Sequence, residues 1–132
     1  MNDKFIDLIR WLLMAAMLIY FAYFKGWIFN NFENISPQQA HTLLEQSSDI
    51  LLVDVRSKKK FTQYHIKNAM HIEMNELDSC KIDAQKVLIY SERGERSVQA
   101  SRVLATRSFD VLNLEGGLVF WVRAGYELEK NN

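Results

Sequence analysis

The segment most able to carry chemistry has the sequence YSERGERS and runs from Tyr90 to Ser97. It lies where an apolar run, VLIY, stops and a helical pattern starts, with a glycine in the connecting turn. Such a turn directs successive backbone N–H groups inward and adds the positive end of the helix dipole. The sequence therefore predicts a cradle for an anion or a thiolate, built from Ser91, Glu92, Arg93, Gly94, Glu95 and Arg96.

A second polar position lies at the end of the apolar run ILLVDV, from Ile50 to Val55. This run contains Asp54 and is followed directly by Arg56. In an open parallel sheet, ligands collect beyond the carboxyl ends of the strands, and both Asp54 and the cradle loop lie at such ends. We expect Asp54 and Arg56 to brace the loop through hydrogen bonds rather than to take part in chemistry.

The segments that must position these residues alternate between helical and strand patterns, which is typical of an α/β domain with a largely parallel sheet. Ser36, Pro37 and Gln39 predict a helix start with a capping box, and an apolar stripe of Ala40, Leu43 and Leu44 follows. The expected strands cover residues 50–55, 69–72, 87–90 and 111–114, and the later helices cover 96–107 and 118–126, with a short irregular or helical stretch at 75–80.

Length and charge bound the function. The 132 residues are enough for one modest domain plus an appendage. Sixteen basic and sixteen acidic side chains give no net charge, so the basic footprint of a nucleic-acid-binding protein is missing. With the single cysteine Cys80 and three scattered histidines, disulfide scaffolds and structural zinc sites are excluded. We expect no metal, no cofactor and no nucleic-acid partner.

The appendage is an apolar segment at the N-terminus. Fourteen consecutive residues, 11–24, carry no charge, and as a helix they would span about 21 Å. Apolar flanks and the long side chains of Arg10 and Lys25 extend this length toward the ~30 Å hydrocarbon layer. The sequence predicts a single-pass membrane span through about residues 8–29. Residues 1–32 are then an anchor with a short linker, and residues 33–132 form the domain.

Three other interpretations of this segment fit less well: a buried core helix, a signal peptide and a helix lying in the membrane interface. Residues 11–24 have no polar face for an interfacial helix, and bulky aromatics stand where a signal peptide would have small residues before its cleavage site. Lys4 and Arg10 precede the segment and only Lys25 closely follows it, which mildly favours a cytoplasmic N-terminus and a non-cytoplasmic domain.

Three blocks of the chain, in order, resemble the rhodanese family. LLVDVRSKKKFTQYHIKNAMHI resembles the block in which a strand ends in Asp-Val-Arg and an aromatic residue and His-Ile follow. YSERGERSVQASRVL resembles the active-site loop and its helix, and LNLEGGLVFW resembles the closing block with Gly-Gly and tryptophan. The match runs from about Ser36 to Tyr126. The resemblance implies a rhodanese-like fold of about five mostly parallel strands flanked by helices.

Active members of this family carry a cysteine at the first position of the loop. The resemblance implies that this cysteine takes sulfane sulfur from a donor such as thiosulfate and passes it to a thiol or cyanide. Here the position is occupied by Ser91. A serine hydroxyl is neither ionised nor reactive toward sulfur, so we expect sulfur transfer by the family mechanism to be lost.

The loop also differs in charge, because Glu92 stands where family loops commonly have arginine. Glu92 and Glu95 offset Arg93 and Arg96, or they point into solvent. Affinity for sulfate or thiosulfate would then come mainly from backbone N–H groups and Arg96, and we expect it to be poor. The sequence favours a membrane-anchored, catalytically inactive module that binds a protein partner or a small anion.

Two alternatives stay open. The first is a thiosulfate sulfurtransferase, which requires that Ser91 replace a native cysteine or that Cys80 enter the pocket. The second is a subunit of a membrane complex that acts through its N-terminal helix. A serine nucleophile is disfavoured, since no Gly-x-Ser-x-Gly elbow surrounds Ser91.

Several conspicuous residues have simpler interpretations. We expect Trp121 to lie in the core and His65 to be a packing histidine. Gly116 and Gly117 predict a tight turn that needs positive φ or close backbone approach. The lysine run 58–60 is expected to be a solvated surface, with contact to anionic lipid as the alternative.

Overall fold

Five parallel strands form the central sheet of the computed structural model, which describes residues 2–131. The spatial order is β1-β6-β5-β2-β4, and every neighbouring pair is parallel. This confirms the predicted α/β fold with a sheet of about five mostly parallel strands. The strands are β1 (Glu33–Ile35), β2 (Ile50–Asp54), β4 (Met70–His71), β5 (Lys86–Tyr90) and β6 (Asp110–Leu114), and a separate antiparallel pair joins β3 (Tyr64–His65) to β7 (Glu129–Lys130).

The register of the central strands brings the two polar positions together. β5 lies between β6 and β2 and is buried along nearly its whole length, as its apolar sequence KVLIY requires. Asp54, the last residue of β2, pairs with Tyr90, the last residue of β5. The carboxyl ends of both strands therefore meet at one edge of the sheet, where the cradle loop begins.

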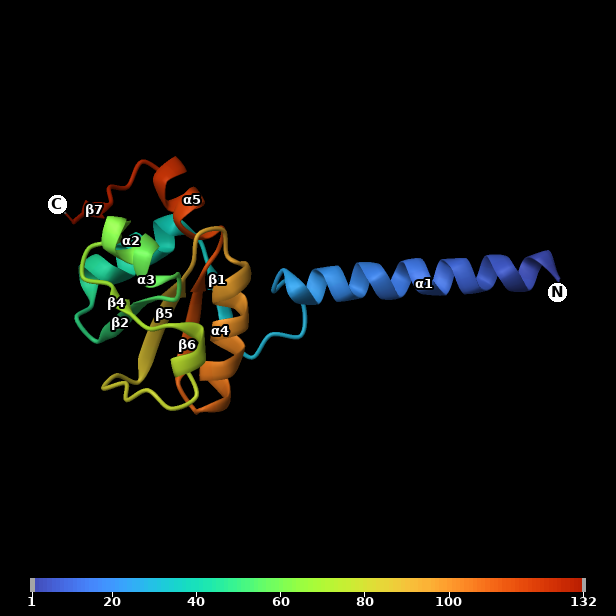
Figure 1. Cartoon of the computed structure of the whole chain (residues 1–132), viewed down its shortest axis with the longest axis horizontal. Coiled ribbons are helices and arrows are strands. Elements are labelled where there is room, and N and C mark those ends of the chain that lie inside the picture. Colours follow the sequence, from blue (N-terminus) through green and yellow to red (C-terminus); the bar gives the residue numbers. More distant parts are fainter. Residues whose placement is uncertain (1, 132) are drawn as a thin grey trace.

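Helices cover both faces of the sheet (Figure 1). One face packs against α2 (Pro37–Gln46) and α5 (Gly117–Arg123), with Trp121 buried in that core as predicted. The other face packs against α4 (Glu95–Thr106) and the short 3₁₀ helix η1 (Met74–Glu76). The short α3 (Lys58–Gln63) follows β2 and leads into β3.

The start of α2 follows the predicted capping box. The Ser36 hydroxyl oxygen accepts from the Gln39 backbone N–H at 3.2 Å, and the Gln39 side chain accepts from the Ser36 N–H at 2.9 Å. The helix then buries Ala40 and partly buries Leu43 and Leu44 against the sheet. The predicted apolar stripe is thus confirmed.

The helix α1 (Asp3–Phe24) extends away from the domain as a straight rod (Figure 1). Its 22 residues correspond to about 33 Å at 1.5 Å per residue, and none of its side chains is buried. Within residues 2–131 it is the one helix long and apolar enough to cross a membrane. It ends five residues earlier than the predicted span, because Gly26 follows in a left-handed conformation (φ +75°), and residues 27–29 are not helical.

The structure contains elements that the sequence did not predict, namely β1, α3, β3 and β7. These are short, and the polar sequences of β1 and α3 show no periodicity that would mark them. The closing helix was expected to reach residue 126 but ends at Arg123, shortly before Gly125 in a left-handed conformation (φ +92°). His65 is buried against α3, with Nδ1 lying 3.0 Å from the Phe61 carbonyl oxygen.

Candidate functional site

The cradle loop wraps around the hydroxyl of Ser91. This side chain is 2% exposed, and its Oγ accepts from the backbone N–H groups of Gly94 at 3.1 Å and Ser97 at 3.2 Å. The Ser97 hydroxyl, which donates to the Gly94 carbonyl, lies 3.2 Å from the same Oγ. Gly94 makes the turn possible with φ +104°. Two N–H donors and the start of α4 thus converge on the Ser91 hydroxyl.

The N-terminus of α5 holds the backbone of this loop. Leu118 N–H donates to the Ser91 carbonyl at 3.0 Å, and Val119 N–H donates to the Glu92 carbonyl at 3.1 Å. Gly117 approaches so closely that a Cβ placed there would lie 2.3 Å from the Ser91 carbonyl oxygen. Its φ is +60°, and that of Gly116 is +75°. The predicted need for glycine at both positions is confirmed.

Arg56 connects the end of β2 to the cradle loop. It is 2% exposed and binds Asp54 with two nitrogens, Nε at 3.0 Å and Nη2 at 2.9 Å from Oδ2. Its Nη1 donates to Glu92 Oε2 at 3.0 Å, and Nη2 also donates to the Tyr64 carbonyl. Burial alone would lower the pKa of Arg56, but a hydrogen bond with Asp54, the charge of Asp54 and a hydrogen bond with Glu92 raise it, so the guanidinium stays charged.

The phenol of Tyr90 completes the buried polar layer beneath the loop. Its hydroxyl oxygen accepts from the Ile66 backbone N–H at 3.1 Å. Burial, followed by the charge of Asp54 and a hydrogen bond with it, raises the pKa of Tyr90 far above its usual value. The phenol therefore stays protonated and acts as a fixed structural link between β5 and the segment after β3.

Replacing Tyr90 with phenylalanine is expected to destabilise the domain by about 1–3 kcal/mol, because the buried Ile66 N–H loses its acceptor while the ring volume is kept. Urea unfolding monitored by circular dichroism measures this difference. As a control, Tyr126→Phe alters a phenol for which no hydrogen bond is recorded among residues 2–131, and its unfolding free energy should not change. Equal effects of the two substitutions would contradict this role of Tyr90.

Above the loop lies a cavity of about 220 Å³. Neither glutamate of the loop points freely into solvent, which corrects one expectation: Glu92 pairs with Arg56, and Glu95 pairs with Lys25 at 2.7 Å. Lys60 from α3 adds a positive charge that was not assigned to the site from the sequence. The lining is consequently net positive, and it consists of Arg56, Lys60, Ser91, Glu92, Arg93, Glu95 and Arg96.

The structure brings Asp54, Arg56 and the six loop residues to one edge of the sheet and adds Lys60 and Lys25. Lys60 lies in the short helix α3, whose sequence shows no helical periodicity. The position of Lys60 at the site therefore could not be predicted from the sequence. Lys25 lies 70 residues before Glu95, and nothing in the sequence connects the two. These contacts are set by tertiary packing.

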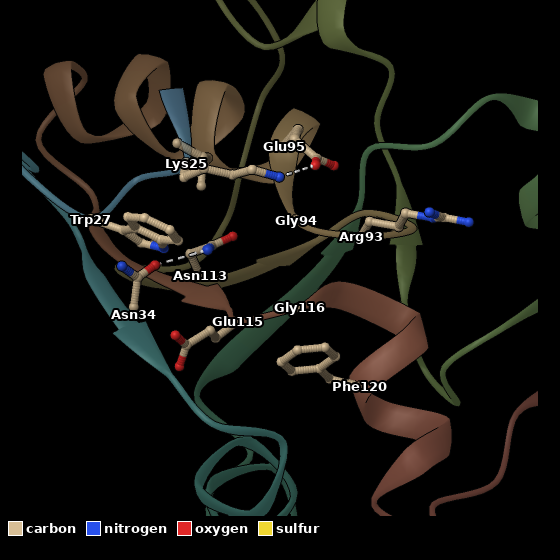
Figure 2. A pocket seen from close by; sticks show the side chains of 11 residues that line it. Lys25, Trp27, Asn34, Arg93, Gly94, Glu95, Asn113, Glu115, Gly116 and Phe120 are labelled. Atoms are coloured by element: carbon tan, nitrogen blue, oxygen red, sulfur yellow. Dashed lines mark hydrogen bonds and ion pairs between the residues drawn. The ribbon is translucent and has the colours of Figure 1, made fainter. Parts of the chain in front are cut away.

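A second cavity of about 240 Å³ lies beside the cradle loop, between the loop and the segment that follows α1 (Figure 2). Asn113 Nδ2 donates to Asn34 Oδ1 at 2.9 Å, and Asn34 Nδ2 donates to the Gly26 carbonyl at 2.7 Å. This pair of side-chain amides joins β6 and β1 to the segment directly after α1. The other lining residues are Lys25, Trp27, Arg93, Gly94, Glu95, Val98, Glu115, Gly116 and Phe120.

Cys80 lies away from the cradle. Its sulfur is 3.6 Å from Arg107 Nη1, directly after the last residue of α4. The cradle is at the first turn of the same helix, and its 12 residues correspond to about 18 Å. Cys80 is the single cysteine of the sequence, so the cradle contains no thiol.

Comparisons with known proteins agree with this geometry. The Rhodanese-like domain family matches residues 36–124. A sulfurtransferase of Allochromatium vinosum is 35% identical over 95 residues, which cover 69% of this chain and 89% of the relative. Thiosulfate sulfurtransferase GlpE of Coxiella burnetii is 34% identical over 94 residues, covering 68% of this chain and 87% of the relative.

A solved structure gives the same result in three dimensions. The crystal structure of a rhodanese-like domain protein from Staphylococcus aureus superposes with a TM-score of 0.63 at 27% sequence identity. The superposition covers 76% of this chain and 100% of that protein. With three sequence blocks, the parallel sheet and the loop around residue 91 all in agreement, the chain belongs to the family of rhodanese-like domains.

Proposed function

We propose that this protein is a membrane-anchored rhodanese-like module that binds a small oxyanion in its cradle and transfers no sulfur. The observation that carries the proposal is the position of Ser91 Oγ, where the N–H groups of Gly94 and Ser97 converge. This arrangement would stabilise a thiolate, but it surrounds a hydroxyl. A hydroxyl stays protonated at neutral pH and forms no persulfide, so the covalent step has no nucleophile.

Backbone donors and charge support retained anion binding. Among residues 2–131, no acceptor is recorded for the backbone N–H groups of Glu92, Arg93 and Arg96. These groups lie at the N-terminus of α4, where the helix dipole favours negative charge. The paired glutamates leave Lys60, Arg93 and Arg96 to attract a dianion such as sulfate or thiosulfate.

The membrane anchor in this proposal is α1. This helix has the length and apolar composition of a membrane span and buries none of its side chains in the domain. The names of the sulfurtransferase relatives favour the alternative, sulfur transfer to a thiol or cyanide. That alternative needs a thiol in the cradle, and Cys80 lies beyond the far end of α4.

Glu92→Gln is expected to tighten sulfate and thiosulfate binding by roughly tenfold, about 1.4 kcal/mol, because it removes a negative charge and frees Arg56 Nη1 for the anion. Isothermal titration calorimetry on the full-length protein in detergent micelles measures both affinities. Glu115→Gln is a matched control, since this carboxylate lies at the second cavity and does not line the cradle.

Two outcomes would count against the proposal. Thiocyanate formation by the unmodified protein, from thiosulfate and cyanide, would establish sulfur transfer. Absence of anion binding in both the unmodified protein and the Glu92→Gln variant would show a closed cradle and would favour a protein partner instead.

A further inference from the structure

The C-terminal end of α1 and the segment that follows it are packed along one face of α4, the helix whose N-terminus forms the cradle. We call residues 23–34 the strap. The Arg102 guanidinium lies 3.7 Å from the centroid of the Tyr23 ring and donates to the Tyr23 carbonyl and to Asn30 Oδ1. Gly26 packs so closely on Val98 that a Cβ at Gly26 would lie 2.6 Å from it.

The third contact of the strap is with the cradle itself. Lys25 Nζ lies 2.7 Å from Glu95 Oε1, and about a third of each side chain is exposed. Glu95, Val98 and Arg102 are spaced by three and four residues, so the strap contacts one continuous face of α4. Figure 2 shows the Lys25 side chain extended toward Glu95 at the first turn of this helix.

Glu95 is the carboxylate best placed to compete with an anion. It is the first residue of α4, and the helix has no side-chain cap at Gly94. A carboxylate in the first turn is attracted by the same N–H groups and helix dipole that would hold a bound anion. Lys25 supplies the opposing attraction, and its hydrogen bond lowers the pKa of Glu95, so the carboxylate is ionised and paired at neutral pH.

We propose that Lys25 is a positioning residue of the cradle: by holding and neutralising Glu95, the docked strap keeps the N-terminus of α4 open to an anion or a thiolate. Without Lys25, the free carboxylate repels an incoming anion and competes for its donors. The ligand affinity of the cradle therefore depends on the segment that connects it to α1. This inference rests on the proposed anion site, but its effect on a thiolate is independent of any bound anion.

The test uses the full-length protein with Ser91→Cys, and the pKa of the introduced thiol is measured from the pH dependence of its alkylation by iodoacetamide. Peptide mass spectrometry separates this thiol from Cys80. Lys25→Met is expected to raise the thiol pKa and to slow alkylation at pH 7 by roughly three- to tenfold, because an unpaired carboxylate disfavours the thiolate. Lys25→Arg should keep the original value.

The decisive control is the same change with Glu95→Gln. If Lys25 acts through Glu95, Lys25→Met has no effect on the thiol pKa once residue 95 is neutral. An equal effect of Lys25→Met in both backgrounds, or none in either, overturns the proposal. Sulfate titrations of the variants with Ser91 intact test anion binding separately, so failure of the anion site leaves the thiol measurement decisive for Lys25.

Discussion

Ser91→Cys is expected to raise thiosulfate:cyanide sulfurtransferase activity on the order of 10³-fold above that of the unmodified protein. Removal of a catalytic nucleophile costs enzymes built around one roughly 10⁶-fold in rate, so restoring it in an assembled site should have a large effect. The Gly94 and Ser97 N–H groups already converge on the side chain at this position and would lower the pKa of a thiol there. Thiocyanate formation measures the activity.

The covalent step can be followed directly. The introduced thiolate attacks the sulfane sulfur of thiosulfate, sulfite leaves, and the protein gains one sulfur atom as a persulfide, which intact-mass spectrometry detects. Cys80→Ser in the same background should leave this gain unchanged, because Cys80 lies beyond the other end of α4. A variant with Ser91→Cys that folds, binds thiosulfate and gains no sulfur would show that the loop has lost more than its nucleophile.

Asp54→Leu is expected to destabilise the domain by about 3–5 kcal/mol. The substitution leaves the buried Arg56 guanidinium without its main counter-charge and removes the acceptor of the Arg56 backbone N–H, which lies 2.8 Å from Asp54 Oδ1. Chemical denaturation measured by far-UV circular dichroism gives the change in unfolding free energy.

The double variant Asp54→Leu with Arg56→Met provides the control. Replacing a buried ion pair by apolar side chains of similar volume is often nearly neutral, so the double variant should recover most of the stability lost in the single variant. Glu92, which is partly exposed, can then be solvated. A double variant as unstable as Asp54→Leu would mean that Asp54 stabilises the domain mainly through Tyr90 and the loop.

The fold was predictable because its main elements carry strong local signals. The apolar runs of β2 and β5, the capping box at Ser36 and the paired glycines at 116 and 117 each specify their local structure. The strand β1 was missed because its three residues, ENI, form a strand only by pairing with β6. The pair of β3 and β7 has two residues in each strand and depends on the closing segment folding back.

The backbone of the site could be predicted from the sequence, but the ion pairs that set its charge could not. A strand, a glycine turn and a helix start mark a cradle in any parallel sheet, so residues 91–96 could be located from the sequence. The charge of the cradle could not, because it depends on Arg56 reaching Glu92 and on Lys25 reaching Glu95 across 70 residues. A sum over the loop gave no net charge, whereas the folded cavity is net positive.

The docking of the strap on α4 bears on where the module meets its ligand. Because Tyr23 already contacts Arg102, one residue before α1 ends, no flexible tether separates an anchored helix from the domain. For a protein anchored as proposed, the cradle would sample only the thin layer of water next to the lipid headgroups. Anionic lipids deplete small anions within about 8 Å of their surface at physiological salt. The fraction of cradles that hold an anion would then depend on the lipid composition as well as on the bulk concentration of the anion.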